Sequence, residues 1–356
     1  MRIAFDVSPL SHPRTGVGNY IRGSLAGLVE AAGGAHEVVA FAPTSPLGLK
    51  AIPRALAGIP VETRLRFLPF AHFWRQGWSR LGRPPVERFL GPVDVLHFSD
   101  WMYPPQRGGV RSSMMHDLVP LRFPHWVQGR TKRMHRAKYR NAARTCDVIF
   151  VNSEFTKGEV VQWLGGAPEK IVVAYPGVDE RYGPDGDSAD LGRPYVLTVA
   201  TLEPRKNLET LLAARLPDGH ALAVVGAAGW GPQPKLDRPD VIRLGYVDDD
   251  ELARLYRGAA AFVYPSRFEG FGIPIVEAMA SGVPVVASAH PSLDEAAGDA
   301  AVRADPDDPV AISAALEEAL RRRDELVARG LVHAAGFRWA RTGRTMLDTF
   351  SGILGG

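Results

Sequence analysis

Short apolar runs recur along the whole chain, and segments of mixed polarity separate them. In the first half the runs occupy residues 3–7, 38–41, 93–98, 110–115, 147–152 and 170–175. In the second half they occupy residues 195–200, 221–226, 241–244, 260–264 and 283–287. Apolar runs of this length are typical of parallel strands that are buried on both faces, with helices between them. The pattern therefore predicts an α/β protein built on parallel sheets.

One polar stretch interrupts this alternation. Residues 176–194 are rich in Gly, Pro and Asp, a composition that is typical of a linker. A length of 356 residues fits two domains at ~150 residues per domain. We therefore predict two Rossmann-like domains that face a cleft, residues 1–180 and residues 194–336.

A glycine loop and a short helix follow the apolar run at residues 260–264. Gly270 and Gly272 allow a tight turn and a close approach of the backbone to a ligand. Pro274 suits the first turn of a helix, and Gly282 suits the position after its end. The N-terminus of such a helix presents N–H groups and a partial positive charge, which predicts an anion site.

Two carboxylates flank this predicted anion site. Glu269 lies in the loop, and Glu277 lies in the last turn of the helix. Carboxylates accept hydrogen bonds from sugar hydroxyls, so that the stretch suits a ligand with both hydroxyls and a phosphate. The alternative is that both glutamates are solvated surface charges. The glycine loop and the strand before it favour the ligand site.

A pair of cations follows the strand at residues 195–200. Arg205 and Lys206 lie at its carboxyl end, where they suit a phosphate group. The alternative is a solvated turn, and we expect the turn to be exposed in either case.

The first half offers two weaker candidates. Gly16 and Gly18, within residues 14–20, join a strand to a helix at residues 20–32. They suit either a phosphate site or a tight turn, and the residues alone leave both open. His116 directly follows the strand at residues 110–115, at the carboxyl end where ligands bind in such sheets, although a lone histidine is often structural.

Together these segments resemble the retaining glycosyltransferases of the GT-B fold, in particular glycosyltransferase family 4. Residues 266–286 resemble the family's signature of two glutamates separated by seven residues. Residues 203–207 read Glu-Pro-Arg-Lys-Asn, and residues 116–120 read His-Asp-Leu-Val-Pro, two further segments of the family. The resemblance covers nearly the whole chain and is most specific between residues 195 and 305. It also implies that a last helix, at about 337–356, packs back onto the first domain.

The resemblance implies a role for each candidate residue. Glu269 and the loop amides would hold the donor sugar, and Glu277 would hold the nucleotide ribose. Arg205 and Lys206 would hold the donor pyrophosphate. Because Ala200 and Thr201 occupy the region where many relatives carry a further arginine, Arg205 is expected to carry more of the charge. The candidate catalytic residues are His116, Glu269, Arg205 and Lys206, and the candidate donor-binding residues are Gly16, Gly18, Arg205, Lys206, Glu269, Gly270, Phe271, Gly272 and Glu277.

The resemblance also implies an activity. The chain is expected to transfer a sugar, with mannose favoured, from a nucleotide diphosphate donor to a hydroxyl of a glycan or a lipid-linked sugar, with retention and without a cofactor. Two alternatives remain. A nucleotide-sugar epimerase of the same fold would act on the donor without an acceptor, and a non-catalytic nucleotide-sugar binding protein would bind without turnover.

Several pairs of acidic residues have the spacing of a metal site, but their positions in the sequence do not favour metal binding. Asp185 with Asp187 and Asp305 with Asp307 lie in loops rich in Pro and Gly, away from the predicted strand ends. The acids at residues 248–251 fit the first turn of a helix, where the helix dipole favours them. Because Arg205 and Lys206 can neutralise a diphosphate, we expect no metal.

Composition limits the partners and the compartment. A formal net charge of +3 is too small to indicate nucleic-acid binding. The single cysteine, Cys146, fits a reducing cytoplasm, and neither a signal-peptide pattern nor an apolar run of ~20 residues is present.

Basic residues are nevertheless concentrated in the first half. A predicted helix at residues 130–144 carries Lys132, Arg136, Arg140 and Arg144 at every fourth position, a spacing that gathers them on one face. Residues 70–88 mix arginines with Phe73, Trp74 and Trp78. Both segments suit peripheral contact with an anionic membrane. The alternatives are a solvated helix face and tryptophans that belong to the core.

Overall fold

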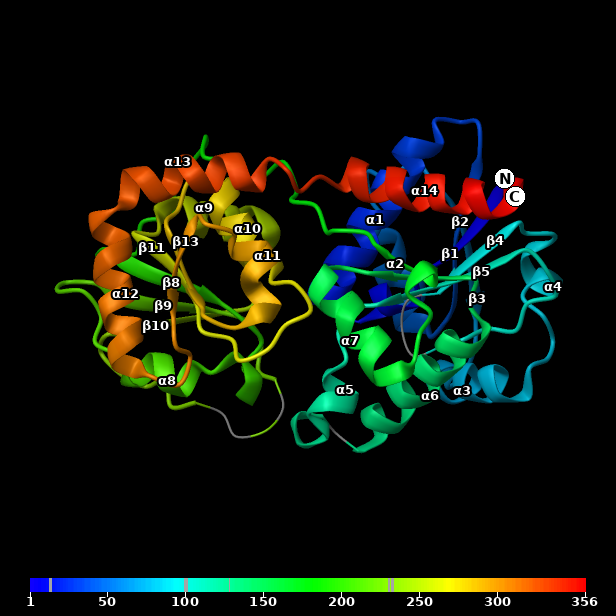
Figure 1. The fold of residues 1–356 in the computed structure, drawn as a ribbon, viewed down its shortest axis with the longest axis horizontal. Coiled ribbons are helices and arrows are strands. Elements are labelled where there is room, and N and C mark those ends of the chain that lie inside the picture. Colours follow the sequence, from blue (N-terminus) through cyan, green and yellow to red (C-terminus); the bar gives the residue numbers. More distant parts are fainter. Residues whose placement is uncertain (13–14, 99–101, 128, 230, 232–233) are drawn as a thin grey trace. The chain divides into compact units, whose positions relative to one another are not determined.

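Two parallel sheets, each with its own helices, carry the fold (Figure 1). The computed structural model describes the chain apart from residues 13–14, 99–101, 128, 230 and 232–233. The first unit comprises Met1–Gly177 and Arg338–Gly356, and the second comprises Val178–Phe337. The predicted class, α/β with two Rossmann-like units, is confirmed.

The sheet of the first unit has the strand order β3-β2-β1-β4-β5-β6-β7, and its pairs are parallel. Its strands are β1 (Arg2–Asp6), β2 (Glu37–Thr44), β3 (Glu62–Phe67), β4 (Val95–Phe98), β5 (Val110–Met115), β6 (Val148–Val151) and β7 (Ile171–Val173). Its helices are α1 (Gly16–Ala32), α2 (Pro46–Ala55), α3 (Ala71–Leu81), α4 (Glu87–Leu90), α5 (Val119–Arg122), α6 (Gly129–Thr145), α7 (Glu154–Leu164) and α14 (Trp339–Gly355), with 3-10 turns η1 (Ser8–Ser11), η2 (Pro124–Trp126) and η3 (Pro168–Lys170).

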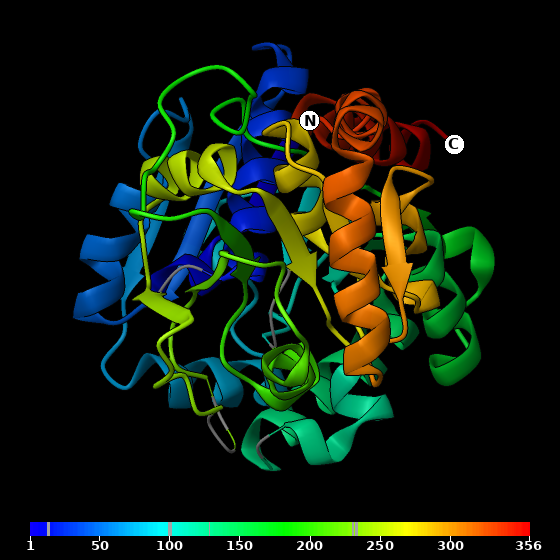
Figure 2. The ribbon, with the colours of Figure 1, turned by 90° about the vertical axis from the view of Figure 1, so that its left-hand side faces the viewer.

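The second unit repeats the plan with six parallel strands in the order β10-β9-β8-β11-β12-β13. Its strands are β8 (Tyr195–Val199), β9 (Ala221–Val225), β10 (Val241–Gly245), β11 (Ala261–Tyr264), β12 (Val285–Ser288) and β13 (Ala301–Ala304). Its helices are α8 (Leu208–Ala213), α9 (Asp249–Gly258), α10 (Ile273–Ala280), α11 (Asp294–Ala297), α12 (Pro309–Arg321) and α13 (Arg323–Ala334), with 3-10 turns η4 (Pro204–Lys206) and η5 (Pro291–Leu293). Helix α12 packs across β11, β12 and β13 (Figure 2).

Buried apolar residues of the strands explain why both sheets form. Along β11 all four residues are buried, and β12 is buried along its whole length. Strands that are covered on both faces gain apolar burial from each side, which is why their sequences form continuous apolar runs.

Helix α14 belongs to the first unit, where it packs against α1 (Figure 1). A Cβ atom at Gly343 would lie 1.9 Å from the carbonyl carbon of Gly27 on α1, and one at Gly27 would lie 1.8 Å from the carbonyl oxygen of Trp339. The two helices therefore approach closely, and Met346, Leu347 and Phe350 of α14 enter the core of the first unit.

Three elements differ from the sequence predictions. Residues 309–329 do not form one helix, because α12 ends at Arg321 and α13 begins at Arg323. Residues 178–193, predicted as a linker, group with the second unit, where the N–H of Ala189 donates to the carbonyl of Arg254 at 2.9 Å. The third difference is the start of the first long helix, because α1 begins at Gly16 rather than at Tyr20.

Candidate active site

The sheet of the second unit reverses its strand order between β8 and β11. Strand β8 pairs with β9 on one side and with β11 on the other. From β8 the chain builds the sheet outward through β9 to β10, and it then returns to the other side of β8 to add β11, β12 and β13. In open parallel sheets, ligands bind at the carboxyl ends of the strands that flank such a switch point. Arg205 and Lys206 follow β8, and Glu269 follows β11. The fold thus brings together two segments that lie far apart in the sequence.

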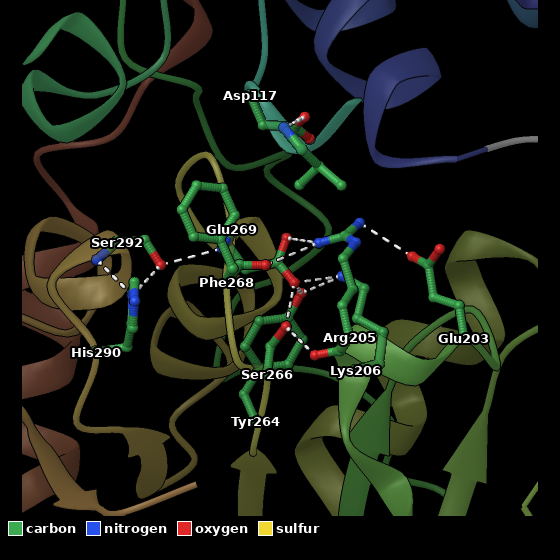
Figure 3. Close-up of polar contacts among 11 residues, drawn as sticks. Asp117, Glu203, Arg205, Lys206, Tyr264, Ser266, Phe268, Glu269, His290 and Ser292 are labelled. Carbon is green, nitrogen blue, oxygen red and sulfur yellow. Dashed lines mark hydrogen bonds and ion pairs between the residues drawn. The ribbon is translucent and has the colours of Figure 1, made fainter. Parts of the chain in front are cut away.

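Glu269 lies at the centre of a hydrogen-bonded network (Figure 3). Its Oε2 accepts from Arg205 at 2.7 Å, and its Oε1 accepts from Lys206 at 2.6 Å. The Oε1 atom also accepts from the hydroxyls of Ser266 at 2.5 Å and Tyr264 at 3.1 Å. The Glu269 N–H donates to Ser292 Oγ at 3.0 Å, which fixes the loop from its other side. The expected group of Glu269, Arg205 and Lys206 is therefore assembled within one unit.

Electrostatics keep Glu269 ionised. Burial alone would raise the pKa of this carboxyl, but Arg205 and Lys206 outweigh burial and lower it from 4.5 to about 2. Because the folded pKa lies below the ordinary value, the stability that this carboxylate contributes is fully present above pH 4.5 and is lost as the pH falls toward about 2. Burial and the neighbouring Arg205 lower the pKa of Lys206, against the opposing pull of Glu269.

The cation pair is less exposed than we expected. Lys206 is 9% exposed, and its Nζ also donates to Tyr264 Oη at 2.8 Å. Arg205 donates to the carbonyl of Phe268 at 3.0 Å and pairs with Glu203 at 3.0 Å. The prediction of an exposed turn was wrong, because the loop after β11, at residues 267–269, packs over this turn and covers it. Since Glu203 and Glu269 balance the two cations, the group is formally neutral and its polar atoms are held in place.

The loop that leads into α10 owes its shape to Gly272. Its φ of +104° is a left-handed value, and an added Cβ would lie 2.7 Å from Leu293 Cδ2. The helix then begins at Ile273 with Pro274 in its first turn. The Phe271 side chain is buried against Phe337, with ring centroids 5.2 Å apart, so that only its backbone could contact a ligand.

Glu277 is buried and lies in the last turn of α10. It is 6% exposed, and its Oε2 accepts a hydrogen bond from the Tyr256 hydroxyl of α9 at 3.2 Å. The alternative in which Glu269 and Glu277 are solvated surface charges is therefore wrong.

His116 of the first unit directly follows β5. Its ring contacts that of Tyr20 edge-on at 5.1 Å, and its Nε2 is buried without a hydrogen-bond partner among the described residues. Burial lowers the pKa of His116 to about 3, and the charge of Lys138 acts in the same direction. The imidazole is therefore neutral near pH 7, with one ring nitrogen unpaired.

Gly16 and Gly18 lie in the first turn of α1 rather than in a turn that precedes it. Thr15 caps this helix by accepting a hydrogen bond from the Gly18 N–H at 3.3 Å. A Cβ at Gly16 would meet no atom within 4 Å, so the fold itself does not require a glycine there. Arg14, the first residue of the predicted segment, lies outside the described residues.

The pair of Asp305 and Asp307 and the acids at the start of α9 have structural roles. Asp307 pairs with Arg267 at 2.8 Å, and its N–H donates to Asp305 at 2.9 Å. Asp248 caps α9 by accepting from the Glu251 N–H at 2.9 Å, as the first-turn interpretation predicts. Among the described residues, no three His, Cys, Asp or Glu side chains gather as a metal site would need.

The sequence did not reveal several members of the Glu269 network. Tyr264 and Ser266 are polar residues at the end of a buried apolar strand, a signal that could have identified them. Ser292 gave no comparable signal, because its contact with Glu269 depends on the packing of separate loops. Glu203 lies in the Glu-Pro-Arg-Lys-Asn segment, but its ion pair with Arg205 was not predicted.

Comparisons with known proteins agree with this geometry. The family model for Glycosyltransferase Family 4 matches residues 14–182, and the model for Glycosyl transferases group 1 matches residues 193–322. The chain is 30% identical over 376 residues to the O-antigen chain mannosyltransferase B of Escherichia coli, covering 95% of this chain and 96% of the relative.

Solved structures share the fold. Sucrose-phosphate synthase from Thermosynechococcus elongatus aligns with a TM-score of 0.72 and 19% identity over 99% of both chains. Anabaena Alr3699/HepE, solved in complex with UDP and glucose, aligns with a TM-score of 0.70 and 16% identity over 98% of this chain and 99% of its own. At these identities the likeness shows the fold alone.

The two Rossmann-like units and these structural neighbours define the GT-B fold. The family models and the mannosyltransferase relative show that the chain is a glycosyltransferase. The chain belongs to glycosyltransferase family 4, as its motifs predicted. Within the described part of the chain, no helix has the length and apolar content that crossing a bilayer requires.

Proposed function

We propose that this glycosyltransferase transfers mannose, with retention, from a nucleoside diphosphate donor to a hydroxyl of a glycan or a lipid-linked sugar. The observation that carries the proposal is the arrangement of Arg205, Lys206 and Glu269 at the switch point of the second sheet. Mannose is favoured because a relative that matches along 96% of its own length is an O-antigen chain mannosyltransferase.

In the proposed reaction, the bond between the sugar's anomeric carbon and the diphosphate oxygen breaks. A bond forms between that carbon and the acceptor oxygen, on the same face of the sugar. The acceptor proton passes to the departing diphosphate. Arg205 and Lys206 stabilise the negative charge that grows on this group, a role for which groups held in advance are effective.

We assign the two glutamates different roles. Glu269 holds the two cations in position and, through its loop, contacts the transferred sugar, whereas Glu277 binds the ribose. For His116 we propose a hydrogen bond to the sugar. A general base works best with a pKa near the working pH, and the low pKa of His116 therefore argues against that role.

The donor is tested by the thermal stability of the purified chain with GDP-mannose, UDP-glucose and the bare diphosphates. A ligand at ~100 times its Kd adds about 2.7 kcal/mol of stability. We expect GDP-mannose to give the largest shift, and NMR of the product to show the anomeric configuration of the donor. No shift with any nucleotide sugar would contradict the proposal. Turnover of a nucleotide sugar without an acceptor would favour the epimerase.

We also expect activity without a divalent metal. Arg205 and Lys206 supply the positive charge that a metal would otherwise bring to the diphosphate. Transfer rates should remain within about twofold after dialysis against EDTA. A complete loss that manganese or magnesium restores would overturn this part of the proposal.

Peripheral contact with an anionic membrane remains part of the proposal. Of the four stripe residues on α6, Arg140 and Arg144 are exposed, whereas Lys132 and Arg136 are half-buried. A lipid-linked acceptor would bring the enzyme to such a surface.

A further inference from the structure

The first unit contains a cavity of about 220 Å³ whose lining is mostly apolar. It lies among β2, the edge strand β3, helix α3 and residues 83–90. Of its fourteen lining residues, eleven are apolar and the other three are arginines. Seven of the lining residues are exposed, so the cavity opens onto the surface, and water inside it finds few polar partners on the protein. Hydrocarbon suits such a cavity better than water.

Three arginines give this cavity a cationic rim. Arg64 and Arg66 are two residues apart on β3 and therefore lie on the same face of the strand. Arg64 pairs with Glu62. Within the described part of the chain, neither Arg66 nor Arg83 forms an ion pair, and both are exposed. Arg66 and Arg83 can therefore bind an anion at the rim of the cavity.

Helix α3 covers one side of the cavity and exposes apolar side chains around it. Arg75 anchors the helix by donating to the carbonyl of Pro43 at 2.6 Å, and Trp78 Nε1 donates to the carbonyl of Pro84 at 2.6 Å. Phe73 and Leu81 are 68% and 76% exposed, and Trp74 is 49% exposed. The alternative in which the tryptophans belong to the core is wrong for Trp74.

Exposed apolar residues are concentrated here. Of the fourteen large hydrophobic residues that are exposed in the described part of the chain, six fall within residues 67–89: Phe67, Phe70, Phe73, Trp74, Leu81 and Phe89. Scattered exposed apolar residues are normal, but a concentration of them beside polar groups marks a binding surface.

We propose that this cavity binds one apolar chain of a phosphate-headed membrane lipid, with the phosphate at Arg66 and Arg83. Free phosphate would use the arginines and leave the cavity empty. An apolar peptide would fill the cavity and leave the arginines without an anion. A phosphate-headed lipid matches both features, and the exposed aromatic side chains of α3 suit the membrane interface. The inference rests on the proposed function only in assuming that the enzyme works at a membrane.

The test uses the full chain and vesicles, without nucleotide sugar. Wild-type protein should float with phosphatidylglycerol vesicles but not with phosphatidylcholine vesicles, and binding should fall as salt is added. Phosphatidylglycerol with brominated acyl chains should quench tryptophan fluorescence, because Trp74 and Trp78 line the cavity. The double variant Trp74→Phe/Trp78→Phe should still float but lose most of this quenching.

Matched variants separate the cavity from general charge and hydrophobicity. Leu81→Glu should lower vesicle affinity at least about tenfold by placing a charge beside the cavity, whereas Val332→Glu, equally exposed on α13, should not. Arg66→Ala should lower affinity about fivefold, whereas Arg321→Ala on α12 should leave it unchanged.

Two results would overturn the proposal. One is absence of binding to phosphatidylglycerol vesicles at low salt. The other is flotation with no more quenching in the wild type than in the double variant, which would show that the acyl chains reach neither Trp74 nor Trp78 of the cavity lining. Because Leu81→Glu should keep its thermal shift with GDP-mannose, a failure of lipid binding can be distinguished from a failure of donor binding.

Discussion

Replacing Lys206 with alanine should lower the rate of sugar transfer by about two orders of magnitude or more. The variant loses a charge that would act on the departing diphosphate, and removing one such group typically lowers kcat by roughly 10²–10³. Because Lys206 is buried and bonded to Glu269, the variant should also lose about 3 kcal/mol of unfolding free energy. Turnover under saturating donor and urea unfolding measure the two effects.

Tyr264→Phe is the matched control for Lys206→Ala. It removes a hydroxyl that bonds both Lys206 and Glu269 but leaves every charge in place. We expect about 1 kcal/mol of destabilisation and less than about tenfold loss of turnover. Near-wild-type transfer by Lys206→Ala would show that Lys206 does not act in the reaction. Equal losses of turnover in Lys206→Ala and Tyr264→Phe would indicate that Lys206 has a purely structural role.

The second prediction separates the two glutamates, using glutamine variants because both side chains are buried. Glu277→Gln should weaken binding of the bare nucleoside diphosphate by about 10–100-fold, because the proposed ribose contacts lose a charged acceptor. Glu269→Gln should change that affinity only a few-fold while abolishing transfer. Calorimetry with GDP and UDP measures both affinities.

Tyr256→Phe provides a control for the second prediction. It removes the hydroxyl that donates to Glu277 and should weaken nucleotide binding less than Glu277→Gln does. Equal affinity losses in Glu269→Gln and Glu277→Gln would contradict the proposed division of roles.

Much of the fold could be predicted from the sequence, because the strands are buried on both faces. The four residues of β11 and the four of β12 are apolar or small, and their runs identify them without any knowledge of the sheet. The candidate site was also readable in part, because Glu269, Gly272 and Glu277 lie within nine residues of one another.

The burial of individual site residues could not be predicted from the sequence, because it depends on contacts between distant segments. Lys206 is buried because a loop 63 residues later covers it, so that its local surroundings suggested an exposed turn. The sequence left open whether Trp74 belongs to the core, because aromatic side chains usually gain by burial, and the structure shows it half-exposed. Its exposure follows from the way Arg75, its neighbour on α3, is anchored to Pro43.

The packing of α14 on α1 has a consequence for biosynthesis. Ile21, Leu25 and Leu28 of α1 share a core with residues of α14, which are synthesised after the whole second unit. At about 5–20 residues per second, the intervening Val178–Phe337 delays completion of that core by on the order of 10 s. During translation the second unit can therefore mature before the first, and the apolar face of α1 is available to chaperones until α14 has been synthesised.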